Sequence, residues 1–435
     1  MSLFQKTISL GLFVGLAVLT LGSLVYAEEV TLTIWDFKYG EVEGAQPVMK
    51  KIDEMFMKAY PDIKIDHQAQ PFNDGQYYEL LRAAAAANEG PDIALFHSGR
   101  SATVLAEVLV RLDDYIAPWR DEITEFSWKA CAVNQNLEEG IILMPITVQG
   151  FGIYYNKSLF TQAGLDPDTP PKDYESFIKA CEALKSAGIV PMLEQRKGYP
   201  KSVQYLGRML VANAYPTEDR LRGLMEGSTN FTDPEFVGAL KLLEEMRAKG
   251  YFDPEASGLS YWGDVRPKFR AGKGAMIYGL LSDIAHWKEF SDALGKDNVG
   301  FFPNVNMPGQ SVKDRLAFQG AGIGYGVFTW SKHQDAAVEY AEFYAREGAV
   351  VLMQDLGALV PNTKLELSSL DYPVLHDILE YVKTTPTATY DRFIPGSLAK
   401  TVEQNQSALW MNGEITFDEY IQKLQKELEY AREDQ

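Results

Sequence analysis

The order of apolar and polar residues in the first part of the chain predicts alternating strands and helices. Short runs that are apolar throughout, or in which every second residue is apolar, are typical of strands. Longer segments with apolar residues three and four positions apart are typical of helices that bury one face. The strands expected here are Val30–Trp35, the segment with Ile63 and Ile65, and Asp92–Phe96, and the helices are Gln46–Tyr60, Gly75–Asn88 and Ser101–Val110. This order predicts an α/β fold with a mainly parallel sheet flanked by helices.

The same alternation returns in the rest of the chain. Strands are expected to end at Asn156 and to span Gly274–Tyr278, Val299–Phe302 and Ile323–Phe328. Helices are expected at Asp173–Ser186, Pro234–Lys249, Asp335–Arg346, Leu398–Asn412 and Thr416–Arg432. The sequence has no internal repeat and no low-complexity linker, so we do not expect its parts to be joined by a flexible tether.

The first 27 residues have the pattern of an export signal. Lys6 precedes the apolar run Ile8–Leu21, and Val25-Tyr26-Ala27 supplies the small residues of a cleavage site. The run is short for a membrane span, although an uncleaved anchor is the alternative. Because no cysteine lies near the cleavage site, a lipid anchor is not expected. The pattern predicts a protein secreted to the periplasm with no stable membrane insertion.

Composition and charge exclude several classes of function. The 435 residues are 46% hydrophobic, as in a globular protein, and carry a formal net charge of −19. An acidic chain is unsuited to neutralising phosphates, so nucleic acid is not an expected partner. The two cysteines, Cys131 and Cys181, either pair in an oxidising compartment or lie buried as thiols.

Enzyme and cofactor motifs are mostly absent from the sequence. There is no phosphate-binding loop, no nucleophile elbow and no ligand spacing for zinc among the five histidines, so no cofactor and no metal are expected. The run GAGIGYG (Gly320–Gly326) contains a G-x-G, but the residues after Gly322 read as a strand instead of a helix. Acidic pairs such as Asp113-Asp114 could serve glycoside hydrolysis, yet a solvated surface explains them as well.

One long motif points to a family. The segment YYNKSLFTQAGLDP (Tyr154–Pro167), followed by Pro170-Pro171, closely resembles the signature of family 1 extracellular solute-binding proteins, which are relatives of maltose-binding protein. Supporting segments occur in the family's order along the chain. They are LTIWD (Leu32–Asp36), GPDI (Gly90–Ile93), FRAGKGAM (Phe269–Met276), GALVP (Gly357–Pro361) and MNGEIT (Met411–Thr416).

The resemblance implies a two-lobed periplasmic binding protein fold of type II. The N-terminal lobe would comprise residues 28–146 plus 321–363, and the C-terminal lobe residues 147–320 plus 364–435. The chain would cross between the lobes near Pro145–Gln149, Gln319–Gly322 and Asn362–Lys364, which together form the hinge. Such a protein is not an enzyme. It is expected to act as a monomer that closes on its ligand and delivers it to the transmembrane subunits of an ABC permease.

Candidate ligand-binding residues follow from the rule that ligands lie beyond the carboxyl ends of strands. This rule selects Trp35, Asp36, Phe37, His97, Ser98, Arg100, Tyr278 and Gly279. For Asp36, a helix N-cap or a surface turn is an equal alternative. The resemblance adds Gln149 and Gly322 at the hinge. Further candidates are Tyr77, with a surface role as the alternative, and Trp262 as a stacking platform, with a core role as the alternative. The resemblance adds Tyr390 and Asp391, near the position where some relatives have a stacking Trp that this chain lacks.

These aromatic and polar strand ends favour a carbohydrate ligand, from a mono- to an oligosaccharide. Leu280-Leu281 stands where many relatives have Pro-Trp, so the cleft is not expected to copy a maltodextrin site. The alternatives are a charged non-sugar solute, such as a glycerol phosphate ester, a polyamine or a peptide, and an exported hydrolase. An acidic ligand would need a cation, for which Arg100, Arg266 and Arg392 are the candidates.

Overall fold

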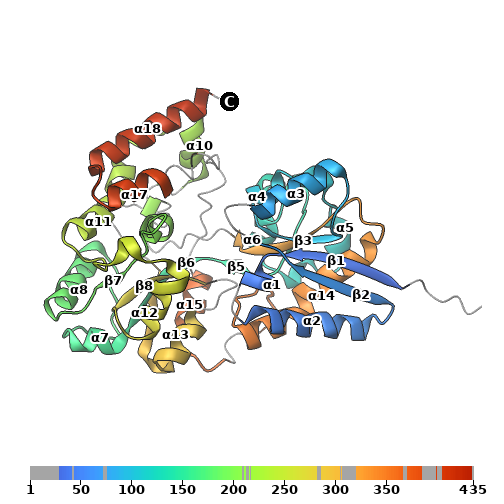
Figure 1. The fold of residues 1–435 in the computed structure, drawn as a ribbon, viewed down its shortest axis with the longest axis horizontal. Helices are drawn as coiled ribbons and strands as arrows, with labels where there is room; N and C mark the ends of the chain where they lie inside the picture. Colours follow the sequence, from blue (N-terminus) through green and yellow to red (C-terminus); the bar gives the residue numbers. More distant parts are fainter. Residues whose placement is uncertain are drawn as a thin grey trace, which may run out of the picture.

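The computed structural model describes residues 29–41, 44–71, 76–207, 210–211, 215, 217–281, 286–303, 305, 320–365, 370–384, 398 and 404–433. These residues form two lobes, each built around a sheet (Figure 1). We call N-lobe the part around the five-stranded sheet β2-β1-β3-β11-β4, and C-lobe the part around the four-stranded sheet β7-β8-β6-β9. The two-lobed α/β architecture expected from the sequence is therefore confirmed.

Both sheets are mixed instead of mainly parallel as expected, because each contains one reversed strand between its neighbours. In the N-lobe, β1 pairs in parallel with β2 and β3, and β11 runs antiparallel to β3 and β4. In the C-lobe, β7 and β8 are parallel, and β6 runs antiparallel to β8 and β9. The N-lobe strands are β1 (Val30–Asp36), β2 (Ile63–Ala69), β3 (Ile93–His97), β4 (Met144–Pro145) and β11 (Ile323–Val327). The C-lobe strands are β6 (Phe151–Asn156), β7 (Met192–Leu193), β8 (Met276–Leu280) and β9 (Val299–Phe302).

A short ribbon lies where the chain passes between the two sheets. Strand β5 (Val148–Gln149) leaves the N-lobe sheet after β4 and precedes β6 of the C-lobe. It pairs antiparallel with β10 (Gly320–Ala321), which precedes β11 of the N-lobe. A third connection passes nearby, because the N–H of Val148 donates to the carbonyl oxygen of Leu359 at 2.7 Å. The passages through β5 and β10 are thus hydrogen-bonded to each other, and β5 is also hydrogen-bonded to the third connection at Leu359.

Helices on both sides of the N-lobe sheet bury apolar faces against it. Helix α2 buries Met49, Ile52 and Phe56 at helical spacing, and Phe56 meets Tyr340 of α14 with ring centroids 5.1 Å apart. Figure 1 shows α3 on the opposite side of the sheet from α2. The N-lobe helices are α1 (Lys38–Glu41), α2 (Ala45–Ala59), α3 (Gln76–Ala87), α4 (Arg100–Thr103), α5 (Asp113–Ile116), α6 (Glu125–Ala130) and α14 (Gln334–Val351).

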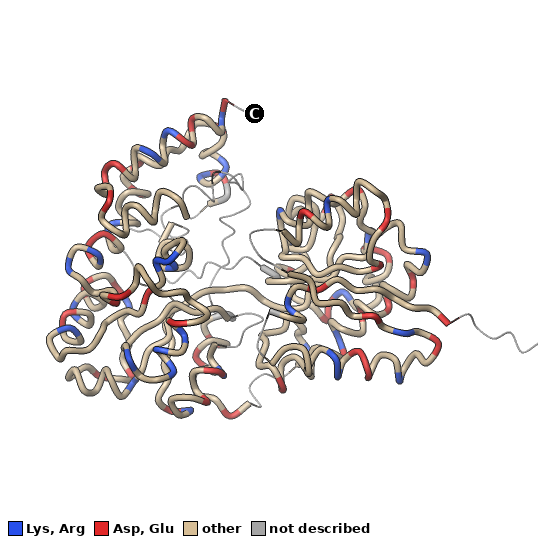
Figure 2. Tube along the Cα trace, viewed as in Figure 1, with Lys and Arg blue, Asp and Glu red and all other residues tan. Residues whose placement is uncertain are grey.

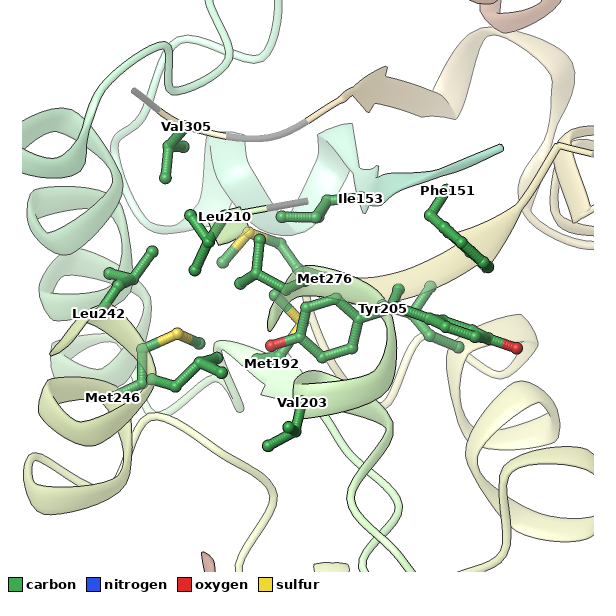
Figure 3. Packing of buried hydrophobic residues seen from close by; sticks show 14 of the residues in the cluster. Phe151, Ile153, Met192, Val203, Tyr205, Leu210, Leu242, Met246, Met276 and Val305 are labelled. Atoms are coloured by element: carbon green, nitrogen blue, oxygen red, sulfur yellow. The ribbon is translucent and has the colours of Figure 1, made fainter. Parts of the chain in front are cut away.

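The C-lobe core is packed from strands and helices far apart in sequence. Side chains of β6, β7 and β8, such as Ile153, Met192 and Met276, lie against Leu242 and Met246 of α11 (Figure 3). The C-lobe helices are α7 (Lys157–Gln162), α8 (Tyr174–Ser186), α10 (Glu218–Glu226), α11 (Pro234–Ala248), α12 (Arg266–Arg270), α13 (His286–Leu294), α15 (Pro373–Thr384), α17 (Gln406–Met411) and α18 (Phe417–Glu433). Charged residues lie mainly along helices and loops at the outside of both lobes, and the strands carry few (Figure 2).

Most of the expected elements agree with the structure within a few residues, and their ends have local causes. Helix α8 begins after Asp173, whose carboxylate accepts from the N–H of Ser176 at 2.8 Å in a capping box. Helix α18 begins after Thr416, whose hydroxyl accepts from the N–H of Glu419 at 3.1 Å. The first part of the expected helix Leu398–Asn412 lies largely outside the described residues, and α17 covers its end.

The expected helix over Ser101–Val110 is wrong beyond Thr103. Helix α4 stops there, and a 3₁₀ turn follows at Ala106–Val108. The backbone then joins the edge of the sheet region, because Leu109 forms an isolated bridge with Phe328 and the N–H of Val110 donates to Val327 at 2.9 Å. Tertiary pairing has replaced the local helical hydrogen bonds.

The two cysteines are free thiols in different cores. Cys131 belongs to the N-lobe cluster and Cys181 to the C-lobe cluster, and both are fully buried. Burial raises the pKa of each thiol well above its usual range. Of the two alternatives in the sequence, the structure has the buried thiols.

Candidate ligand-binding site

The carboxyl ends of β1 and β3 bring the first group of candidates together. Because these strands are parallel neighbours, Phe37 and His97 meet with stacked rings whose centroids are 4.9 Å apart. Tyr77 of α3 lies with its edge toward Phe37, at 5.1 Å between centroids. The strand-end rule therefore correctly predicted that Phe37 and His97 are neighbours.

Burial divides this N-lobe group into supporting and accessible residues. Phe37 and Tyr77 are fully buried, and the Tyr77 hydroxyl lies 2.9 Å from the carbonyl oxygens of both Trp35 and Leu95. Trp35 is half-buried, and its indole N–H donates to the Gln68 side chain at 3.1 Å. Phe37, Tyr77 and Trp35 hold the strand ends in place.

His97, Ser98 and Arg100 are the N-lobe candidates with exposed surface. His97 and Ser98 are half-buried and Arg100, the first residue of α4, is exposed. The Nδ1 atom of His97 lies 2.9 Å from the hydroxyl of Tyr78, whose pKa is raised to about 12 by burial. A ligand at this edge would meet two half-buried polar groups and one exposed guanidinium.

Asp36 serves the fold through both of its carboxylate oxygens. Its Oδ1 accepts from the N–H groups of Lys38 and Tyr39 at 2.6 and 2.9 Å, which is how a side chain caps a helix start. Its Oδ2 accepts from the Tyr325 hydroxyl at 2.8 Å. The capping role that the sequence left as an alternative for Asp36 is thus present, and the carboxylate is fully buried.

A buried histidine joins Asp36 to a second carboxylate. The Nε2 of His67 lies 3.3 Å from Asp36 and its Nδ1 lies 3.0 Å from Asp53, which also accepts from the hydroxyl of Tyr340 at 2.6 Å. Burial opposes protonation of His67, but the bonds to both carboxylates outweigh it and raise its pKa to about 9. The protonated ring bridges β1, β2 and α2.

Two candidates lie at the paired strands between the lobes, Gln149 on β5 and Gly322 directly after β10. Gln149 of β5 is half-buried and pairs with Gly320 of β10. A Cβ on Gly322 would lie 2.8 Å from both the Gln149 Oε1 and the Thr147 Oγ1, so glycine allows this close approach.

On the C-lobe side, Tyr278 and Gly279 shape the end of β8. Tyr278 is fully buried, and its hydroxyl has no hydrogen-bond partner among the described residues. A Cβ on Gly279 would lie 2.4 Å from the ring of Tyr154 and 2.9 Å from the Nδ1 of His286. These two residues act on the site by packing behind its surface.

Trp262 is the exposed aromatic candidate of the C-lobe. It is 42% exposed and stands in a π-helical turn, Tyr261–Val265, which precedes α12. The Arg266 guanidinium carbon lies 4.9 Å from its ring centroid. Arg266 is in turn held by Glu289, at 2.5 Å from Nη2 and 3.1 Å from Nε. The sequence named Arg266 as a cation for an acidic ligand, but its charge is already paired.

An aromatic row connects Trp262 to the strands between the lobes. Phe151, at the start of β6, stacks on Tyr205 with centroids 4.6 Å apart (both are labelled in Figure 3). Tyr205 meets Tyr261 at 5.9 Å, and Tyr261 meets Trp262 at 5.0 Å. Because β6 is antiparallel to β8, Phe151 pairs with Leu280 at the carboxyl end of β8. The row therefore lies at the sheet edge where ligands are expected.

A model of the family "Bacterial extracellular solute-binding protein" matches residues 40–351 of the 435. The chain belongs to this family. The resemblance seen in the sequence is therefore confirmed.

Named relatives of this chain are distant from it in sequence. The sn-glycerol-3-phosphate-binding periplasmic protein UgpB of Escherichia coli K12 is 27% identical over 359 residues, 77% of this chain and 74% of that protein. The match to UgpB of Salmonella typhimurium, also at 27% identity, covers 61% of this chain and 60% of that protein's length.

Solved structures share the whole fold. A chitin oligosaccharide binding protein has a TM-score of 0.78 at 22% identity, covering 93% of this chain and 100% of that one. A sugar transporter protein from Bacillus licheniformis in complex with stachyose has a TM-score of 0.71 at 18% identity, covering 92% and 99%. At these identities the likeness concerns the fold.

The sequence pattern did not indicate one segment beside the candidate residues of the C-lobe, the loop that follows β7. Tyr199, Lys201 and Tyr205 lie on this loop and the turn after it, with Lys201 and Tyr205 buried. Strand β7 has only two residues, so no apolar pattern marked it as a strand whose carboxyl end could be followed. The signal available in the sequence was the presence of two tyrosines, Tyr199 and Tyr205, on either side of Pro200.

The same loop begins with a buried carboxyl group. Glu194 is fully buried and its carboxylate accepts from the N–H of Ser202 at 3.2 Å. Burial raises the pKa of Glu194 to about 8, although Arg196 and the bonds to Ser202 act in the opposite direction.

Three candidates from the sequence lie outside the described residues, namely Tyr390, Asp391 and Arg392. Among the residues that are placed, no group of three metal-ligating side chains occurs. Within those same ranges, no helix has the length and apolar character needed to cross a membrane.

Proposed function

We propose that this solute-binding protein captures a carbohydrate between its lobes and delivers it to the permease of an ABC importer. The observation that carries the proposal is the aromatic row Phe151–Tyr205–Tyr261–Trp262, which ends in a partly exposed indole. Aromatic faces suit the C–H surfaces of sugar rings, and neighbouring polar groups suit their hydroxyls. The names of the structural neighbours, which mention chitin oligosaccharide and stachyose, support the same class of ligand.

The candidate residues take different roles in this proposal. Trp262 stacks on a sugar ring, while His97, Ser98 and Gln149 bond its hydroxyls from the other side. Asp36, Tyr278, Gly279 and Gly322 hold the walls of the site, as do Trp35, Phe37 and Tyr77. Tyr390 and Asp391 stay candidates for direct contact.

Closure of the lobes would couple ligand capture to delivery. In the proposal, residues 28–146 plus 321–363 move against residues 147–320 plus 364–435 about the paired strands β5 and β10. A ligand that touches both lobes favours the closed state by its differential affinity for that state. The protein would work in the periplasm as a monomer after removal of residues 1–27, without catalysing a reaction.

A glycerol phosphate ester is the second candidate ligand. The observation that favours it is Arg100, an exposed guanidinium at the carboxyl end of β3, where a phosphate group could be bound. The 27% identical relatives named as sn-glycerol-3-phosphate-binding proteins support this class.

Thermal unfolding of the protein with a ligand panel separates the two classes. Chitin oligosaccharides, maltose, stachyose and xylan oligosaccharides form one arm, and sn-glycerol 3-phosphate with inorganic phosphate as control forms the other. A ligand present at a hundredfold excess over its Kd stabilises the folded protein by about 2.7 kcal/mol. A shift with a sugar supports the proposal. A shift with the phosphate ester alone, abolished in Arg100→Ala, contradicts it and favours the second candidate.

A further inference from the structure

The C-lobe site contains an aromatic cage that holds a side chain of the protein itself. The Nζ of Lys201 lies 4.8, 4.7 and 5.5 Å from the ring centroids of Tyr199, Tyr205 and Tyr261. Lys201 is only 4% exposed. Distances below about 6 Å between a cation and an aromatic ring mark an attractive interaction.

The loop after β7 is folded so that it brings the lysine into this cage. The Gln195 side chain donates to the carbonyl oxygens of Lys197 and Tyr199 at 3.1 and 3.0 Å, and it accepts from the N–H of Tyr261 at 2.6 Å. The N–H of Lys201 donates back to the Gln195 carbonyl at 3.1 Å. One glutamine therefore ties the lysine and two of the three rings to one framework.

The ammonium group also orients the polar atoms around it. It donates to the Gln204 Oε1 at 2.7 Å and to the Tyr199 hydroxyl at 3.1 Å, and it lies 3.3 Å from the Tyr205 hydroxyl. Tyr205 and Tyr261 are members of the aromatic row that leads to Trp262. The position of Lys201 is thus linked to the surface proposed to contact the ligand.

Aromatic rings together with hydroxyl and amide oxygens form a site of the kind that receives ammonium ligands. Here the Lys201 ammonium occupies that position, toward the hydroxyl edges of Tyr199 and Tyr205. We propose that Lys201 is a specificity-determining residue that fills the cage of Tyr199, Tyr205 and Tyr261, excludes amines from the C-lobe site and positions its tyrosines for a polyol. The inference rests on the proposed function in that it takes this face to be the ligand site.

Substitution of the lysine by alanine tests the occupancy of the cage. In Lys201→Ala the space beyond Cβ is open, and n-propylammonium, which has the three carbons and the ammonium group that the substitution removes, is expected to bind there. We expect millimolar n-propylammonium and putrescine to raise the melting temperature of this variant and to leave the unsubstituted protein unchanged. Propanol, which has the chain without the charge, is expected to have no comparable effect.

Two further variants separate the cage from the folding of the loop. Lys201→Met fills the space without a charge, so it should not respond to amines, and its affinity for the sugar found in the ligand panel should fall about tenfold. Lys197→Ala removes an exposed lysine of the same loop and should match the unsubstituted protein in every assay.

The outcomes decide the inference separately from the proposed function. Stabilisation of the unsubstituted protein by putrescine overturns it, and so does a folded Lys201→Ala variant that ignores both amines. If no sugar stabilises any form of the protein, the proposed function fails, while the response of Lys201→Ala to n-propylammonium still reports whether the cage exists.

Discussion

The two lobes present different kinds of surface to the space where a ligand is proposed to bind. On the N-lobe, Phe37 at the end of β1 and Tyr77 of α3 are fully buried, and the carboxylate of Asp36 is used by the fold. On the C-lobe, an aromatic row reaches the surface at Trp262. The same strand-end rule selected residues in both lobes, but it predicts which side chains are neighbours and not which of them are exposed.

The N-lobe contains a buried charge network of His67, Asp36 and Asp53, and breaking that network should have the largest effect on stability. His67→Ala leaves the carboxylates of Asp36 and Asp53 buried without the ring that bridges them. We expect a loss of about 3–5 kcal/mol in the free energy of unfolding, measured by denaturant titration. His333→Ala, at an exposed position, should stay within about 0.5 kcal/mol of the unsubstituted protein. Equal effects of both changes would contradict the network's role.

The stability of the C-lobe depends on close packing at the end of β8. In Gly279→Ala the new methyl group would lie 2.4 Å from the ring of Tyr154, so we expect a loss of about 1–3 kcal/mol in stability. Gly238→Ala in α11 is the matched control, because its Cβ meets no atom within 4 Å. That control should gain about 0.5–1 kcal/mol from higher helix propensity.

The two lobes should also lose stability in different pH ranges. Glu194 has a folded pKa raised to about 8 from 4.5 by burial, so its contribution is complete below pH 4.5 and is lost as the pH rises through 8. His67 has a folded pKa raised to about 9 from 6.5, so its contribution is complete below pH 6.5 and is lost as the pH rises through 9. In denaturant titrations, Glu194→Gln should reduce the decline in stability between pH 4.5 and 8 and keep the decline between pH 6.5 and 9. An unchanged profile would show that Glu194 is not the group responsible.

Ligand affinity should depend on the exposed aromatic residue of the C-lobe with little effect on stability. Trp262→Ala is expected to weaken sugar binding about tenfold, as measured by calorimetry, and to change the free energy of unfolding by less than about 1 kcal/mol. Tyr430→Ala is the control, because Tyr430 is also an exposed aromatic residue, 48% exposed, on α18. A loss of affinity in both variants would argue against a stacking role for Trp262.

Apolar periodicity predicted most of the longer strands and helices, because the residues of such an element carry its pattern themselves. Strand β9 (Val299–Phe302) and helix α8 with its cap at Asp173 were placed almost to the residue. The pattern failed at Ser101–Val110, where bridging to Phe328 decides the backbone conformation. A spacing along the chain carries no information about a partner more than two hundred residues away.

The arrangement of the candidate site residues was predicted in part, for the same reason. The strand-end rule correctly placed Phe37 beside His97, whereas the role of Trp262, which lies in a partly exposed turn before α12, stays a prediction. It missed Lys201, because its cage is assembled from three tyrosines whose proximity depends on the bonds of Gln195. The bridging role of His67 could not be predicted either, since its two carboxylate partners lie on other elements.

The position of β11 has a consequence for the order in which the protein can fold. This strand lies between β3 and β4 in the N-lobe sheet, yet it is synthesised after the strands of the C-lobe sheet. Until Ile323–Val327 has been made, β3 has an open edge and β4 lacks the strand with which it pairs. A nascent chain of this protein therefore cannot complete its first sheet until the strands of both sheets have been made.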